Sequence, residues 1–145
     1  MRLRPLWIPI ILLSLAGCGE DGVELEKGPF LKVDRDSLGF DQEFGSGTYV
    51  GATGFNSLYI ENGGDAPLEI SKISKSGSGT FSVRLPTELA EGKTLTLESL
   101  KRTFIEVQFK PGEARVYEGK LLIESNAANA AMKEILLSGK GLPPP

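Results

Sequence analysis

The chain has 145 residues, of which 16 are basic and 19 acidic, and it contains one cysteine and no histidine. The net charge of −3 makes nucleic acid a poor partner, because binding to phosphates relies on clustered lysine and arginine. Without histidine, the classical serine, cysteine and zinc hydrolase arrangements lose their commonest base or ligand. We therefore expect a protein that is not an enzyme, with no catalytic residue, no metal site and no nucleic-acid partner.

An uncharged apolar segment follows two arginines at the N-terminus and leads to the single cysteine. Residues 5–16 have the length of a signal-peptide hydrophobic region, and they are too few for a membrane span, which needs roughly 20 residues. Ala16 and Gly17, just before Cys18, have the small side chains that a signal peptidase accepts. Residues 1–17 are therefore predicted to be a signal peptide.

The run Leu15-Ala16-Gly17-Cys18 resembles the bacterial lipobox at every position. The resemblance implies that Cys18 receives a diacylglycerol as a thioether, that the chain is cut before Cys18 and that the freed amine is acylated. These covalent lipids would hold the protein on the lipid bilayer, and no other cofactor is expected. A single acyl chain binds a membrane only marginally, whereas two or three chains anchor it durably. The alternative is an ordinary secretory signal that happens to contain a cysteine.

Residues 18–29 are acidic and punctuated by glycine, which predicts a flexible tether. A coil of this length spans roughly 17–20 Å on average, so the following domain would stay close to the membrane. In Gram-negative lipoproteins, an aspartate directly after the lipidated cysteine tends to retain the protein at the inner membrane. Gly19 occupies that position here, so the resemblance favours the outer membrane of a bacterial cell envelope.

Residues 30–141 are predicted to form one domain, in which apolar and polar residues alternate as they do in half-buried strands. About seven short strands separated by turn signals, without a sustained amphipathic helix, indicate an all-β fold, an antiparallel β-sandwich. A proline-rich tail, residues 142–145, follows the domain. The side chains predicted to fill the space between the two sheets are Ile105, Val107, Phe109, Leu121, Ile123, Ile135 and Leu137.

Two local predictions are more specific. Residues 58–60 and 68–70 alternate on either side of the turn sequence Asn62-Gly63-Gly64-Asp65, which predicts a β-hairpin. Residues 89–100 are ambiguous, because Leu95 and Leu97 alternate as in a strand whereas the preceding residues suit a helical turn.

Seven short motifs follow one another along this domain: LGF at 38–40, LYIENGG at 58–64, PLEI at 67–70, FSV at 81–83, IEVQFKP at 105–111, YEGKLLIESN at 117–126 and ILLSGKG at 135–141. Their order and spacing resemble the ASPM/SPD-2/Hydin type of immunoglobulin-like domain, called choice-of-anchor D in bacterial surface proteins. The resemblance implies an immunoglobulin-like β-sandwich. Segments 41–54 and 90–103 are longer or richer in glycine than the short turns of the family, so the chain departs from it in its loops.

The glycine-rich segment 45–54 is the first candidate site. It lacks the Lys-Ser/Thr pair of a phosphate-binding loop, so we interpret it as a connection between strands. Tyr49 and Phe55 are candidate exposed aromatic contacts of a binding loop. The alternative is that both rings pack on the edge of their own domain.

Two pairs of acidic residues are the second candidate, Asp34 with Asp36 and Asp41 with Glu43. Members of each pair lie two positions apart and would face the same side of a strand. A glycosidase needs two acids facing each other across a cleft, and a calcium site needs more oxygen ligands. We interpret both pairs as solvated surface charge.

Three functions compete on this evidence. The first is an envelope lipoprotein whose non-catalytic domain binds a protein or polysaccharide, or serves envelope architecture. The second is a carbohydrate-processing enzyme or accessory built on the loops, and it requires the acidic residues to converge in a cleft. The third is a periplasmic assembly factor similar to sandwich chaperones, and it requires a long apolar edge strand or groove.

Overall fold

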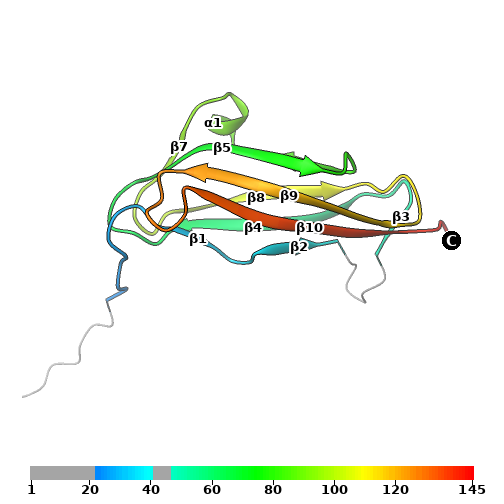
Figure 1. The fold of residues 1–145 in the computed structure, drawn as a ribbon, viewed down its shortest axis with the longest axis horizontal. Coiled ribbons are helices and arrows are strands. Elements are labelled where there is room, and N and C mark those ends of the chain that lie inside the picture. The colour runs from blue at the N-terminus through cyan, green and yellow to red at the C-terminus, as the bar shows by residue number, and fades with distance from the viewer. Residues whose placement is uncertain (1–21, 41–46) are drawn as a thin grey trace, which may run out of the picture.

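The structure is a computed structural model that describes residues 22–40 and 47–145. Leu15, Ala16, Gly17 and Cys18 lie outside the described residues, as do Asp41 and Glu43. The described part is a sandwich of two sheets (Figure 1). Its elements are β1 (Leu31–Val33), β2 (Ser37–Gly39), β3 (Thr48–Tyr49), β4 (Gly54–Asn62), β5 (Leu68–Gly77), β6 (Phe81–Arg84), α1 (Thr87–Ala90), β7 (Leu95–Leu97), β8 (Arg102–Phe109), β9 (Val116–Ser125) and β10 (Met132–Leu142).

One sheet has four strands in the order β1-β4-β8-β6, and all its neighbours are antiparallel. The other has the order β2-β10-β9-β5-β7, with β3 paired to the end of β10. The β-sandwich predicted from the sequence is confirmed. It is not purely antiparallel, because β2 and β3 both run parallel to β10. The described residues form ten strands instead of about seven, because β3 has only two residues and lies in the segment interpreted as a connection, and β7 lies in the segment whose pattern was ambiguous.

All seven predicted core side chains are at most 2% exposed. One of them, Phe109, lies in a cluster of aromatic rings. The ring centroids of Phe81, Phe40 and Tyr117 are 5.0, 5.5 and 5.7 Å from that of Phe109. Gly139 on β10 makes room for this cluster, because a Cβ atom there would lie 2.6 Å from the Phe109 ring. The missing side chain of Gly139 is therefore part of the core packing.

The predicted hairpin between residues 58–60 and 68–70 is wrong. β4 belongs to the four-stranded sheet and β5 to the other, so Asn62 and the residues after it carry the chain from one sheet to the other. The buried Asn62 amide accepts hydrogen bonds from the N–H groups of Gly64 and Phe30, at 2.9 and 3.3 Å. It donates to the carbonyl oxygens of Ala66 and Leu97, at 2.8 and 2.9 Å. The Asn62 side chain, which both donates and accepts hydrogen bonds, thus holds the crossing between the two sheets, the corner that follows β4. The sequence pattern there predicts a hairpin turn.

The helical turn and the strand predicted as alternatives around residues 89–100 both occur. The helical turn is α1, whose Leu89 is buried, and the alternating stretch is β7, which pairs with β5.

Near the N-terminus, the last residues of the predicted tether contact the domain. The Glu26 N–H donates to the Gly63 carbonyl at 3.0 Å, and the Gly28 N–H donates to the Asp65 carboxylate at 2.6 Å.

Candidate functional site

The outer face of the four-stranded sheet carries three exposed aromatic side chains. Tyr59 and Phe55 on β4 are 47% and 62% exposed, and Phe104 on β8 is 55% exposed. Successive strand residues point to opposite faces, so these rings alternate with the buried Leu58, Ile60 and Ile105. The sheet therefore presents large apolar groups to solvent at positions that the core does not use.

Tyr59 and Phe104 face each other across neighbouring strands. They are directly paired in the register of β4 and β8, and their ring centroids lie 6.1 Å apart with the planes inclined at 47°. Cross-strand aromatic pairs stabilise a sheet modestly. The exposed fraction of both rings leaves much of their apolar surface available to a partner. We call Tyr59 and Phe104 the aromatic pair.

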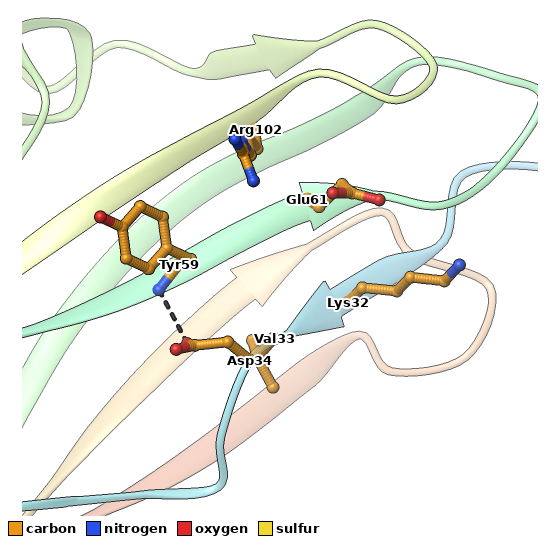
Figure 2. Close-up of a pocket in the computed structure, with 6 residues that line it drawn as sticks. All are labelled: Lys32, Val33, Asp34, Tyr59, Glu61 and Arg102. Atoms are coloured by element: carbon orange, nitrogen blue, oxygen red, sulfur yellow. Dashed lines mark hydrogen bonds between the residues drawn. The ribbon is translucent and has the colours of Figure 1, made fainter.

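An open hollow of about 410 Å³ lies beside Tyr59. Figure 2 shows Tyr59 and Glu61 on β4, Arg102 on the neighbouring β8, and Asp34 just after β1. The side chain of Lys32 extends away from Tyr59, and a Cβ atom at Gly63 would meet its end (Figure 2). The lining residues are Lys32, Val33, Asp34, Tyr59, Glu61 and Arg102.

Asp34 continues the edge of the sheet where β1 ends. Its N–H donates to the Tyr59 carbonyl at 3.2 Å, and its carboxylate accepts the Tyr59 N–H at 2.9 Å. Arg35 forms an ion pair with the same carboxylate at 2.7 Å. Partial burial acts to raise the Asp34 pKa, but the Tyr59 hydrogen bond and then Arg35 outweigh it, so the pKa lies below its usual 3.8. This carboxylate is charged at neutral pH and fixes the backbone next to the Tyr59 ring.

A second, smaller hollow of about 180 Å³ lies on the other side of the aromatic pair, beside Phe104. Arg84 on the edge strand β6 and Glu106 on β8 line it and approach each other to 3.8 Å. Leu85 and Pro86, which follow β6, supply apolar lining. The aromatic pair thus lies between two hollows on one face of the sheet.

The two aromatic residues predicted as a binding loop are exposed, Tyr49 at 41% and Phe55 at 62%. They belong to different sheets, because β3 carries Tyr49 beside β10 whereas Phe55 is the second residue of β4. Only Phe55 shares a face with the aromatic pair. Sequence reasoning missed Tyr59 and Phe104, although each occupies a polar-face position next to a buried residue of an alternating strand.

The acidic residues that the structure describes do not converge. Asp34 contacts β4, whereas Asp36 forms an ion pair with Lys133 of β10, in the other sheet, at 2.6 Å. Both follow β1 in an irregular segment, so the expectation that they share one side of a strand is wrong. Asp41 and Glu43 lie outside the described residues. Across residues 22–40 and 47–145, no three histidine, cysteine or acidic side chains are grouped to hold a metal ion.

A further hollow, of about 460 Å³, lies on the outer face of the six-stranded sheet. Leu136, which is 51% exposed, lines it together with Ser37, Glu118 and Lys120. No aromatic side chain of the described residues lines this hollow, so the aromatic pair is the stronger candidate surface. The described residues also contain no helix long and apolar enough to cross a membrane.

The chain matches no family model and no curated protein sequence. Among solved structures it is similar to the ASH/PapD-like domain 7 of human CEP192, at 18% identity and a TM-score of 0.54, with 79% of this chain and 87% of that one covered. A protein of unknown function from Porphyromonas gingivalis W83 is 13% identical with a TM-score of 0.60, over 84% of this chain and 51% of that one. A family 123 glycoside hydrolase from Clostridium perfringens is 11% identical with a TM-score of 0.55, over 75% and 23%.

This chain spans about half of the Porphyromonas protein and under a quarter of the hydrolase. At such low identities the similarity concerns the fold alone. With two packed sheets and a PapD-like domain among its structural neighbours, the chain has an immunoglobulin-like β-sandwich fold.

Proposed function

We propose that the protein is a bacterial envelope lipoprotein, anchored through lipids on Cys18, whose immunoglobulin-like domain of the choice-of-anchor D kind binds a partner without catalysing a reaction. The outer membrane is the favoured location, and the partner is an envelope protein or polysaccharide. The observation that supports this proposal best is the aromatic pair, which exposes apolar surface on a sheet face that the core does not use.

The arrangement of the chain ends suits such an anchor. The described N-terminal segment leaves the sandwich at one end, and the C-terminus lies at the other (Figure 1). Glu26 and Gly28 are hydrogen-bonded to the corner that follows β4. An anchor at Cys18 would hold that corner nearest the bilayer and leave Phe55, at the start of β4, farther away.

The two competing functions have less support. An enzyme built on Asp34 and Asp36 requires a shared cleft, and these side chains engage different sheets. An assembly factor that works by strand addition requires a long apolar edge strand. The strands β1, β2, β6 and β7 at the sheet borders have three or four residues each. β5 extends past β7 from Ser71 to Gly77, but the lysines and serines of that stretch do not make an apolar edge.

The anchor is tested by replacing its only thiol. We predict that Cys18→Ala abolishes incorporation of radiolabelled fatty acid and releases the protein from the membrane pellet, because no other side chain forms the thioether. Ser14→Ala, in the signal peptide but outside the lipobox, is the matched control and should be labelled normally. Undiminished labelling of the Cys18→Ala variant would contradict the anchor.

The binding role is tested by crosslinking in intact cells that carry the full-length protein. A partner recovered with the wild type should be lost from the Tyr59→Ala/Phe104→Ala variant and retained by Leu136→Ala, which removes an exposed apolar side chain from the opposite sheet. Recovery of neither a protein nor a polysaccharide, or a partner lost only from Leu136→Ala, would contradict binding at the aromatic pair.

A further inference from the structure

We infer that the ligand of the aromatic pair is an uncharged glycan chain that runs across the four-stranded sheet from the β1 side to the β6 side. The inference rests on the proposed binding function and adds the chemical class of the ligand. It follows from three features of the face: the exposed rings, the polar groups beside them and the balance of their charges.

The first feature is the pairing of aromatic faces with polar groups. The face of an aromatic ring is electronegative and attracts polarised C–H bonds, which line the flat faces of sugar rings. Sugar hydroxyl groups around the ring edge both donate and accept hydrogen bonds. Beside Tyr59, Arg102 offers donors and Glu61 offers acceptors within the same hollow. A purely apolar ligand would leave these polar groups without partners.

The second feature is the charge balance. The hollow beside Tyr59 is lined by the cations Lys32 and Arg102 and by the anions Asp34 and Glu61. The smaller hollow contains one residue of each sign, Arg84 and Glu106, already 3.8 Å apart. Neither lining therefore has the excess positive charge that would attract an acidic polymer, and the chain as a whole is negative. The complementary glycan is uncharged.

The third feature is the shape of the face. The Tyr59 and Phe104 rings are inclined at 47° with centroids 6.1 Å apart, so they do not form one flat platform for a single sugar. Each ring instead offers its face to a different sugar of a chain. Open hollows on both sides, about 410 and 180 Å³, provide room for the sugars that follow. This arrangement favours an oligosaccharide over a monosaccharide.

The experiment measures glycan binding by the full-length lipoprotein, purified from membranes in detergent. The probes are neutral gluco-, malto- and chito-oligosaccharides of increasing length, with polygalacturonate as the anionic comparator. We expect binding to at least one neutral series, with an affinity that rises with chain length and depends little on salt. Tyr59→Ala and Phe104→Ala should each weaken it by roughly tenfold or more, as for buried aromatic contacts.

Two variants separate stacking from other effects. Tyr59→Phe keeps the ring and should retain most of the affinity, whereas Leu136→Ala on the opposite sheet should change nothing. Thermal unfolding checks that each alanine variant is folded, and Tyr59→Ser and Phe104→Ser replace any that is not.

Three outcomes would overturn the glycan assignment. The first is that polygalacturonate is the tightest probe and salt weakens it. The second is that neutral glycans bind with unchanged affinity when both rings are removed. The third is that no probe binds while a protein crosslinked in cells still depends on Tyr59 and Phe104, a result that leaves the proposed binding function in place.

Discussion

The two faces of β8 each carry a phenylalanine, and one of these rings is buried whereas the other is exposed. Ile105, Val107 and Phe109 point inward and are fully buried, whereas Phe104 points outward and is 55% exposed. Phe109 lies within a cluster of three other rings, but among the described rings Phe104 pairs with Tyr59 alone. A phenylalanine at an inward position of the strand thus belongs to the core, whereas one at an outward position lies on the surface.

The inner face of the sheet therefore accounts for stability, and the outer face is available for binding. The inner face buries apolar area from both sheets, and that burial is the main term that favours folding. The outer face leaves aromatic area in water, where it contributes little to stability and remains available to a partner. If this division is correct, substitutions on the inner face should change the free energy of unfolding, and those on the outer face should change binding.

The sharpest test compares two phenylalanines on the same strand. Phe109→Ala removes a fully buried ring from the aromatic cluster, so we expect it to lower the free energy of unfolding by about 3–5 kcal/mol. That loss is a large part of the roughly 5–15 kcal/mol typical of a folded domain. Chemical denaturation of the two proteins measures the difference.

Phe104→Ala is the matched control for Phe109→Ala. The ring is more than half exposed and has one aromatic neighbour, so its removal should cost about 1 kcal/mol or less. Equal losses from the two variants would show that the outer ring is part of the stabilising core, and the division between the faces would be wrong.

A second test adds volume to the inner face instead of removing it. Gly139→Ala places a Cβ atom 2.6 Å from the Phe109 ring, so the ring must shift, and we expect a loss of about 1–3 kcal/mol. Gly79→Ala is the control, because a Cβ atom there has no neighbour within 4 Å. Thermal unfolding compares the two variants. A Gly139→Ala protein as stable as Gly79→Ala would mean that the cluster around Phe109 is not closely packed.

Alternation along strands made the inner face predictable from sequence, and all seven expected core residues are buried. The pairing of the strands was harder to predict from the sequence. Asn62 and Gly63 have the composition of a hairpin turn, but Asn62 bonds to Phe30 and Leu97, which are 32 and 35 positions away, and these contacts depend on the assembled fold. A local turn signal does not distinguish a hairpin from a crossing between sheets.

The candidate site was only partly predictable for the same reason. Phe55 was predicted as an exposed aromatic contact because it follows a glycine-rich segment, and it does lie on the proposed binding face. Tyr59 and Phe104 lie 45 positions apart in sequence, and only the register of β4 with β8 brings them together. An aromatic residue at an outward position of a strand is a signal that sequence reasoning can use, but its partner is known only when the strands are paired.

The smallest expected effect concerns Asp34, on the outer face. Asp34→Asn keeps an oxygen that can accept the Tyr59 N–H but removes the charge that contacts Arg35. At neutral pH the wild type should be the more stable by about 0.5 kcal/mol, because partly exposed ion pairs contribute little. The folded-state pKa lies below the usual 3.8, so this contribution is present above pH 3.8 and disappears as the pH falls through the lowered value.

Urea denaturation of the wild type and Asp34→Asn over a range of acidic pH measures this difference directly. Glu69→Gln, which neutralises an exposed carboxylate on β5 in the other sheet, gives the background from losing one negative charge. A gap that is constant across the range, or that widens as the carboxylate is protonated, would mean that the charge of Asp34 does not stabilise the backbone beside Tyr59. The Tyr59 ring would then be held by packing against Phe104, and Phe104→Ala would be expected to disturb it more than any change at Asp34.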